Sequence, residues 1–294
     1  MGTRIQSTDI ASERSSGCGS VDLEVAAAKR CLAKAEVDPR SLGILINTGV
    51  YRDRHVFEPA ISSFIQKKIG GNEEFDGALS TLSFDLMNGG CGAVTGMMVA
   101  DGFLQSGLTR YAMVVSGDAE PVPGASDGYG FSPAAAAVLL TPGGDDEGFF
   151  AFESDSDTRY LEAFRARLEW TRDGDPRTRL VLQSDAAYAD QCAGCAVRSL
   201  ETLLVKAGLT LGDVDLLLPS QSPRGFVTEV SKRTGLGDSV VDVTGEYGDV
   251  HTAGVGMALH TAIADGRFKS SRHVVFLGVG AGVTTALALY RNPL

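Results

Sequence analysis

The stretch Ser83-Phe-Asp-Leu-Met-Asn-Gly-Gly-Cys91-Gly-Ala-Val-Thr-Gly-Met-Met-Val-Ala-Asp101-Gly-Phe-Leu-Gln-Ser-Gly107 decides the fold. A short β-favouring run leads to two glycines and Cys91, and the apolar residues that follow recur at helical spacing. Cys91 is therefore expected at a strand-to-helix turn. A thiol at a helix N-terminus lies at the positive end of the helix dipole, which favours thiolate. The pattern indicates a nucleophile, against the alternative of a small buried hydrophobe.

Composition limits the classes of partner. The chain has 294 residues, 44% of them hydrophobic, and a formal net charge of −11. It has no basic run that could follow a phosphate backbone and no apolar stretch near the roughly 20 residues of a spanning helix. Met1–Asp9 lacks the apolar core of a signal peptide, and five cysteines are an odd number for a disulfide framework. We expect a cytoplasmic protein that binds neither nucleic acid nor membrane and has no metal site.

Alternating helical and strand patterns predict mostly parallel sheets with helices on their faces. Residues 1–20 are expected to be irregular, and Pro142–Glu147 marks a boundary at mid-chain. A weak self-match at a shift of 162 positions indicates two duplicated halves, in which the helix after Cys91 and the helix Thr252–Asp265 are equivalent. Helices are expected at 21–35, 58–70 and 186–207, and strands at 42–48, 111–116, 134–140, 149–153, 179–182, 216–219, 240–243, 274–278 and 285–290.

The segment Phe84-Asp85-(x)5-Cys91-Gly-Ala, followed by Ser106-Gly-Leu-Thr-Arg-Tyr-Ala-Met-Val-Val-Ser-Gly-Asp118, resembles the nucleophile segment of the thiolase superfamily. The branch it is most similar to is ketoacyl-acyl carrier protein synthase III. The resemblance implies a thiolase fold of two duplicated α/β halves in a five-layer αβαβα sandwich. Residues 1–147 would carry the cysteine, and residues 148–294 the His/Asp pair and a glycine-rich loop. It also implies a homodimer across the strand near residue 112, with the family's first strand missing here.

The resemblance also shows where the chain departs from the family. The family's Pro-His-Gln segment reads Pro219-Ser220-Gln221, so the histidine is replaced by Ser220. The family's asparagine is replaced by Asp249, and His251 follows two residues later. A carboxylate would repel a developing enolate, and a serine replaces an imidazole poorly, so decarboxylative condensation is disfavoured.

The remaining groups resemble an acyl-transfer triad. We expect Cys91 to be acylated, His251 to act as general base towards an acceptor, and Asp249 to orient the imidazole. If Asp249 and His251 diverge, Asp242 or Asp127 could be the acid. The alternative for His251 is that it merely caps a helix.

Two further features follow from the resemblance. Glu58 matches a glutamate of the olefin-pathway branch, where the dimer partner contributes it as the base of a non-decarboxylative Claisen condensation. As an alternative, Glu58 is only a favourable dipole partner in the first turn of a helix. Gly280-Ala281-Gly282 matches the family's glycine-rich loop, whose N–H joins that of the cysteine to bind the thioester oxyanion.

Basic residues and a cysteine pair complete the candidates. Arg224, Lys232 and Arg233 fall where the family docks acyl carrier protein, and a second basic cluster comprises Arg159, Arg165, Arg167 and Arg172. Either set could bind the phosphates of coenzyme A, although solvated helix faces would look the same. Cys192 and Cys195 have C-x-x-C spacing but no second pair or flanking histidine, so packing is expected rather than metal binding.

The sequence thus predicts an acyltransferase of a specialised biosynthetic pathway, acting as a homodimer. It would take an acyl group from acyl-CoA or acyl carrier protein onto Cys91 and pass it to a small-molecule acceptor. The thioester is the substrate, and no tightly bound cofactor is expected. The alternatives are a Claisen condensing enzyme that uses Glu58 and a non-catalytic partner subunit of a condensing-enzyme complex.

Overall fold

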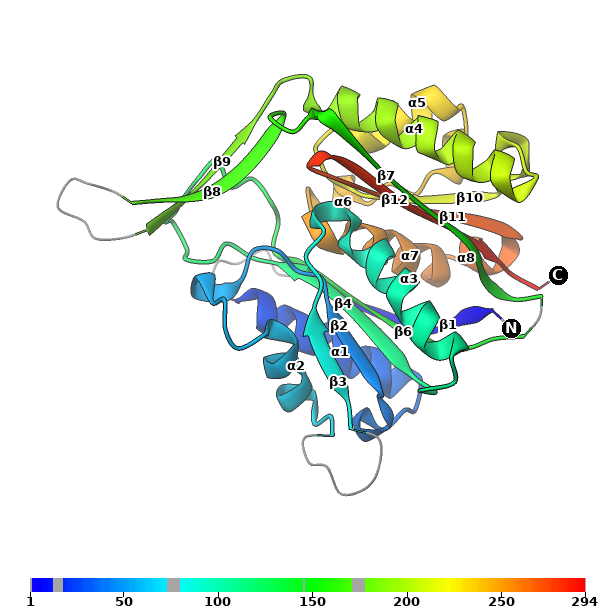
Figure 1. Cartoon of the computed structure of the whole chain (residues 1–294), viewed down its shortest axis with the longest axis horizontal. Coiled ribbons are helices and arrows are strands. Elements are labelled where there is room, and N and C mark those ends of the chain that lie inside the picture. The colour runs from blue at the N-terminus through cyan, green and yellow to red at the C-terminus, as the bar shows by residue number, and fades with distance from the viewer. Residues whose placement is uncertain (1, 13–17, 73–79, 145, 171–177, 294) are drawn as a thin grey trace.

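The computed structural model describes residues 2–12, 18–72, 80–144, 146–170 and 178–293. Helices and two sheets alternate in five layers, which confirms the predicted αβαβα sandwich (Figure 1). From the bottom of the view, the layers are α1 (Ser20–Lys34) with α2 (Ile61–Ile69), the first sheet, α3 (Gly92–Gln105) with α7 (Gly254–Ala264), the second sheet, and α4 (Tyr188–Ala207) with α5 (Phe226–Thr234).

The first sheet has the order β1-β6-β4-β2-β3. Strand β2 is parallel to β3 and β4, whereas β6 is antiparallel to β4 and β1. The elements of this half are β1 (Thr3–Ser12), α1 (Ser20–Lys34), η1 (Pro39–Ser41), β2 (Ile44–Asn47), η2 (Asp53–His55), α2 (Ile61–Ile69), β3 (Leu82–Asp85), η3 (Gly89–Cys91), α3 (Gly92–Gln105), β4 (Ala112–Asp118), β5 (Ser126–Asp127) and β6 (Ala134–Pro142).

The second sheet has the order β10-β11-β12-β7, with only β10 and β11 parallel. A hairpin of β8 and β9 pairs with β5 and projects from the body as an arm (Figure 1). The elements are β7 (Gly148–Tyr160), β8 (Phe164–Trp170), β9 (Thr178–Ser184), α4 (Tyr188–Ala207), η4 (Leu211–Asp213), β10 (Leu216–Pro219), α5 (Phe226–Thr234), η5 (Gly237–Ser239), α6 (Thr244–Tyr247), η6 (His251–Ala253), α7 (Gly254–Ala264), α8 (Arg267–Ser270), β11 (His273–Gly280) and β12 (Gly282–Arg291).

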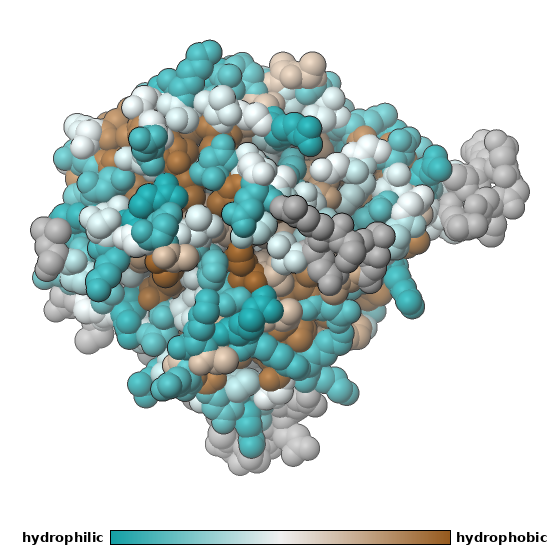
Figure 2. All heavy atoms as spheres, turned by 180° about the vertical axis from the view of Figure 1, so that it is seen from behind, coloured by the Kyte–Doolittle hydropathy of each residue, from teal (hydrophilic) through white to brown (hydrophobic). Residues whose placement is uncertain are grey.

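The middle layer is apolar because it is buried between the two sheets. Helices α3 and α7 are apolar on most sides, as a helix covered by a sheet on each face must be. Gly96 lets α3 approach the first sheet, because a Cβ there would lie only 2.9 Å from Val114 Cγ1. The outer helices bury one face each, against one sheet each. Figure 2 shows the side opposite to Figure 1, where hydrophobic residues form separate patches within a mostly hydrophilic surface.

Four expectations about the fold were wrong. Residues 3–12 form strand β1, so the first strand is present. The stretch Val240–Val243 makes only an isolated bridge from Val240 to Leu217. Both sheets are mixed rather than mostly parallel. Strand β4, near residue 112, has β2 and β6 on its two sides and is closed to a dimer partner.

The division at residue 147 remains a prediction, although the first sheet is built from strands before it and the second from strands after it. Within the described ranges, no helix is both long enough and apolar enough to span a membrane.

Candidate active site

A cavity of about 630 Å³ lies where the two halves meet the β8–β9 arm. Its walls include aromatic side chains, among them Tyr51, Phe131 and Phe164. Tyr51 follows the carboxyl end of β2, which is the end of a parallel strand where α/β folds usually bind ligands. The size suits a small molecule or the reactive end of a larger one.

Cys91 is not on the wall of this cavity. It is 0% exposed, and its Sγ donates to the carbonyl oxygen of Thr284 at 3.2 Å, within the protein. Burial raises the pKa of the Cys91 thiol, and the nearby Cys192 adds to the effect. The expectation that the helix N-terminus favours thiolate was therefore wrong, since desolvation outweighs the dipole.

Gly90, one residue earlier, does line the cavity. A Cβ built there would lie 3.7 Å from the Oγ of Ser220 but only 2.2 Å from the carbonyl oxygen of Val279. The backbone of β11 thus occupies the space that a side chain at residue 90 would need. Ser220 stands at the family's histidine position, and the residue that faces it is Gly90.

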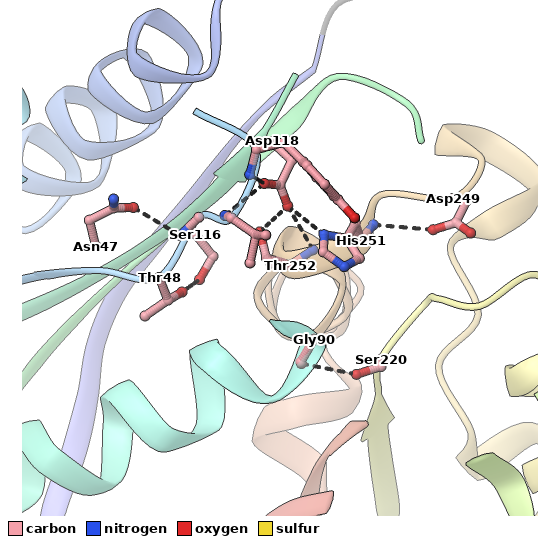
Figure 3. Close-up of polar contacts among 12 residues, drawn as sticks. Asn47, Thr48, Gly90, Ser116, Asp118, Ser220, Asp249, His251 and Thr252 are labelled. Atoms are coloured by element: carbon pink, nitrogen blue, oxygen red, sulfur yellow. Dashed lines mark hydrogen bonds and ion pairs between the residues drawn. The ribbon is translucent and has the colours of Figure 1, made fainter. Parts of the chain in front are cut away.

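The Ser220 side chain forms hydrogen bonds with backbone groups rather than facing a reacting group. Its Oγ donates to the Gly90 carbonyl at 3.3 Å (Figure 3) and accepts from the Val279 N–H at 3.0 Å. Both hydrogen bonds are buried. The serine thereby ties the glycine turn to the end of β11.

His251 does lie on the cavity wall, and its partner is Asp118. The His251 Nδ1 lies 2.7 Å from Asp118 Oδ2 (Figure 3). Asp118 also accepts hydrogen bonds from the N–H groups of Val50, Tyr51 and Thr252 and from the Thr252 hydroxyl. Burial alone would raise the pKa of Asp118, but the charge of His251 and these hydrogen bonds lower it overall. An ionised Asp118 makes Nδ1 the donor and leaves Nε2 as the basic nitrogen.

Asp249 does not orient the imidazole, contrary to expectation. Its Oδ1 accepts from the backbone N–H of His251 at 3.3 Å, because the two residues flank a turn. The other two acids considered also lie elsewhere. Asp242 accepts from the backbone and hydroxyl of Thr244, and Asp127 is exposed on β5.

The imidazole is held between rings. Phe131 stacks on it at 4.4 Å between centroids, and Tyr51 lies 5.1 Å away. The backbone φ of His251 is +38°, in the left-handed region that non-glycine residues rarely adopt. Such strain often occurs at functional sites, where the surroundings fix a side chain in place.

Part of the glycine-rich loop lies at the cavity. Gly280 and Ala281 line it, and a Cβ at Gly280 would lie 3.3 Å from the Gly90 nitrogen. The expected pairing with the Cys91 N–H does not occur, because that N–H donates to the carbonyl of Asn88 at 3.0 Å. Gly282, with φ of +128°, belongs to β12 and does not line the cavity.

The remaining candidates lie outside the cavity or at its mouth. Glu58 is exposed and lies off its wall. Arg224 is exposed and lines it, Lys232 is exposed, and Arg233 pairs with Asp190 and Glu229.

The second basic cluster is neutralised by neighbouring acids. Arg159 pairs with Asp157, Arg165 with Glu162, and Arg167 with Glu169, while Arg172 lies outside the described residues. Cys192 and Cys195 are buried, and among the described residues no cluster could hold a metal ion.

Sequence reasoning missed Asp118, Gly90 and the two rings against His251. Asp118 closes the strand pattern Tyr111–Ser116, and an acid at the carboxyl end of a buried strand was the available signal. Phe131 had no signal, because it sits in an irregular segment. The register at Gly90 and Cys91 could not be read from spacing, since a shift of one residue decides which side chain faces the cavity.

Known synthases are similar to this chain in sequence. Residues 204–292 match the family model described as the C-terminal part of 3-oxoacyl-[acyl-carrier-protein] synthase III. The chain is 28% identical over 270 residues to a β-ketoacyl-[acyl-carrier-protein] synthase III of Pectobacterium atrosepticum, covering 90% of this chain and 82% of the relative. It is 28% identical over 308 residues to the enzyme of that name from Acidiphilium cryptum, covering 99% and 93%.

Solved structures share the fold. The synthase III of Pseudomonas aeruginosa PAO1 matches with a TM-score of 0.82 at 19% identity, covering 100% of this chain and 99% of that one. OleA of Xanthomonas campestris with bound lauric acid and lauroyl-CoA matches with a TM-score of 0.82 at 18% identity, covering 99% of both. The chain is thus similar to β-ketoacyl-[acyl-carrier-protein] synthase III enzymes along most of its length, and it shares the fold of the solved synthase III and OleA structures.

Proposed function

We propose that this chain is an acyltransferase of a specialised pathway that passes an acyl group directly from a CoA or carrier-protein thioester to an acceptor. His251 is the general base, Asp118 orients it, and no acyl-enzyme forms on Cys91. One observation carries the proposal: His251 lies on the cavity wall and is paired with the buried Asp118, whereas the thiol of Cys91 is sealed beneath the wall.

The proposed reaction uses groups already in place. His251 Nε2 takes the proton of the acceptor, whose heteroatom bonds to the thioester carbon. The carbon–sulfur bond breaks, and the imidazolium returns the proton to the leaving sulfur. Asp118 stabilises the imidazolium, and Arg224 at the mouth is suited to a phosphate of the donor.

The test uses acetyl-, hexanoyl-, lauroyl- and benzoyl-CoA with water as the acceptor. We expect the wild type to release CoA faster than His251→Ala, by roughly 10²–10⁴-fold, and to show no mass gain in intact-mass spectrometry. Cys91→Ala should release CoA as the wild type does. A thioester adduct that disappears in Cys91→Ala would overturn the direct mechanism.

A non-catalytic partner subunit is the second candidate. It is favoured by the closed corner at Gly90, Ser220 and Val279, where the family's catalytic histidine is replaced and a side chain at residue 90 has no room. This candidate requires that wild type and His251→Ala release CoA equally slowly from every thioester. The Claisen alternative through Glu58 remains a prediction, since the likeness to OleA concerns the fold alone.

We also propose that the chain forms a homodimer through β3. In the described part of the chain, β3 pairs with β2 alone, and Leu82 on it is 50% exposed. An open edge with an apolar side chain is a ready surface for strand pairing. Analytical ultracentrifugation should show a dimer for the wild type and dissociation for Leu82→Glu, and a monomeric wild type would refute this assembly.

A further inference from the structure

A carboxylate on the cavity wall lacks a counter-ion. Asp249 lines the cavity, and its Oδ1 accepts the His251 N–H. Ser222 supplies a hydrogen bond to the same side chain. Among the described residues, Asp249 forms no ion pair. Figure 3 shows it on the opposite side of His251 from Asp118.

The surroundings compensate this charge only in part. Burial raises the pKa of Asp249, although Ser222, His251 and Arg224 act in the opposite direction. His251 already gives its Nδ1 to Asp118, and Arg224 is exposed at the mouth, beyond ion-pair distance. Asp185, the other acid on the wall, adds a second negative group. A half-buried carboxylate without a paired cation is stabilised by a ligand that brings one.

The rings beside it favour the same ligand. Tyr51 and Phe131 line the cavity next to His251. Aromatic faces attract ammonium groups, and the attraction grows when water is excluded. A negative wall with aromatic neighbours thus selects against an anionic acceptor and for a cationic one.

We propose that the acceptor is a protonated amine, with Asp249 as its counter-ion, so that the product is an amide; this rests on the proposed acyl transfer. Asp249 holds the ammonium beside Nε2 of His251. His251 removes one proton and releases it to water, and the neutral nitrogen attacks the thioester carbon. His251 then takes a second proton from that nitrogen and returns it to the sulfur as the carbon–sulfur bond breaks. The third proton stays on the amide.

The test measures binding without a thioester, with probes matched in shape. Phenethylamine is cationic, 2-phenylethanol is its neutral counterpart, and 3-phenylpropanoate is anionic. Isothermal titration calorimetry should show phenethylamine binding about tenfold or more tightly than 2-phenylethanol, as expected for a charge-assisted hydrogen bond. Asp249→Asn should abolish this preference and leave 2-phenylethanol binding unchanged. Asp185→Asn, on the same wall but more exposed, is the matched control and should keep most of the preference.

The outcomes separate this inference from the proposed function. Equal binding of the three probes, or an amine preference that survives Asp249→Asn, overturns the amine proposal even if CoA release depends on His251. Preferential amine binding without CoA release from any thioester supports the amine site and refutes acyl transfer. Amide detected by mass spectrometry with phenethylamine and a CoA thioester supports both.

Discussion

Replacing Asp118 by asparagine tests the base directly. Asp118 Oδ1 accepts the Val50 and Tyr51 N–H groups at 2.8 and 2.6 Å, and Oδ2 accepts from His251 at 2.7 Å and from the N–H and hydroxyl of Thr252 at 3.2 and 2.5 Å. An asparagine can keep one oxygen towards Val50 and Tyr51. Its NH₂ group would then face three donors, so those hydrogen bonds are lost along with the charge.

The expected loss of stability in Asp118→Asn follows from the burial of Asp118. Removing one partner of a buried, hydrogen-bonded charge pair destabilises by about 3–5 kcal/mol, which corresponds to roughly 10 °C in Tm for a chain of this size. CoA release should fall by about 10²–10⁴-fold, because an NH₂ group opposite Nδ1 favours the wrong imidazole tautomer. Asp185→Asn is the control, since it removes an exposed acid from the same cavity wall and leaves the hydrogen bonds of Asp118 in place.

The pH dependence of stability gives a second measurement. The pKa of Asp118 is lowered in the folded protein, so its contribution to stability is present above the unfolded value of about 4 and is lost as pH falls towards the folded value. Urea unfolding should show the gap between wild type and Asp118→Asn narrowing below about pH 4. Nitrogen-15 spectra of the imidazole should change tautomer in Asp118→Asn alone. If Asp118→Asn kept the stability and the imidazole tautomer of the wild type, Asp118 would not be the residue that orients His251.

Three other substitutions probe the groups around the site. Cys91→Ala should leave CoA release unchanged, and the wild-type thiol should resist iodoacetamide at neutral pH until the chain unfolds, because burial raises its pKa. Gly90→Ala should destabilise by about 1–3 kcal/mol, since its Cβ meets the Val279 oxygen at 2.2 Å; calorimetry that shows no loss would contradict the closed corner. Glu24 is buried, and neither of its carboxyl oxygens has a hydrogen-bond partner among the described residues. Burial, the largest cause, raises its pKa, as do nearby acids. Relative to Glu24→Gln, the wild type should lose up to about 1.4 kcal/mol per pH unit above about pH 4.3, and parallel stability profiles would refute a protonated Glu24.

The fold was predictable because its signals are local. Helical spacing after Cys91 and the apolar run before Asn47 lie in elements that the structure confirms as α3 and β2. Strand β1 was missed because its sequence, Thr3–Ser12, is mostly polar and lacks a regular apolar alternation. The strand is held by pairing with the distant β6. Long-range pairing of this kind leaves little trace in a short window.

The site was only half predictable. His251, Gly280 and Ala281 line the cavity, and their places at a helix start and a strand end are visible in the sequence, whereas their roles stay predictions. The acid was misassigned because sequence proximity favoured Asp249, whereas β4 brings Asp118 from 133 positions away. Cys91 was misjudged because its type suggested chemistry, but burial depends on a one-residue register that only packing reveals.

The closed corner determines where chemistry can occur. The Ser220 hydroxyl both donates and accepts, so Gly90, Ser220 and the Val279 N–H form a satisfied, buried set. Opening it to admit a nucleophile at residue 90 would break both hydrogen bonds and displace a strand end, which is costly for buried groups. The opposite wall requires no such rearrangement, because the imidazole of His251 is already oriented by Asp118 and open to the cavity. We therefore propose that catalysis in this chain depends on a base acting on bound reactants, which would place the selectivity in the cavity wall rather than in a covalent intermediate.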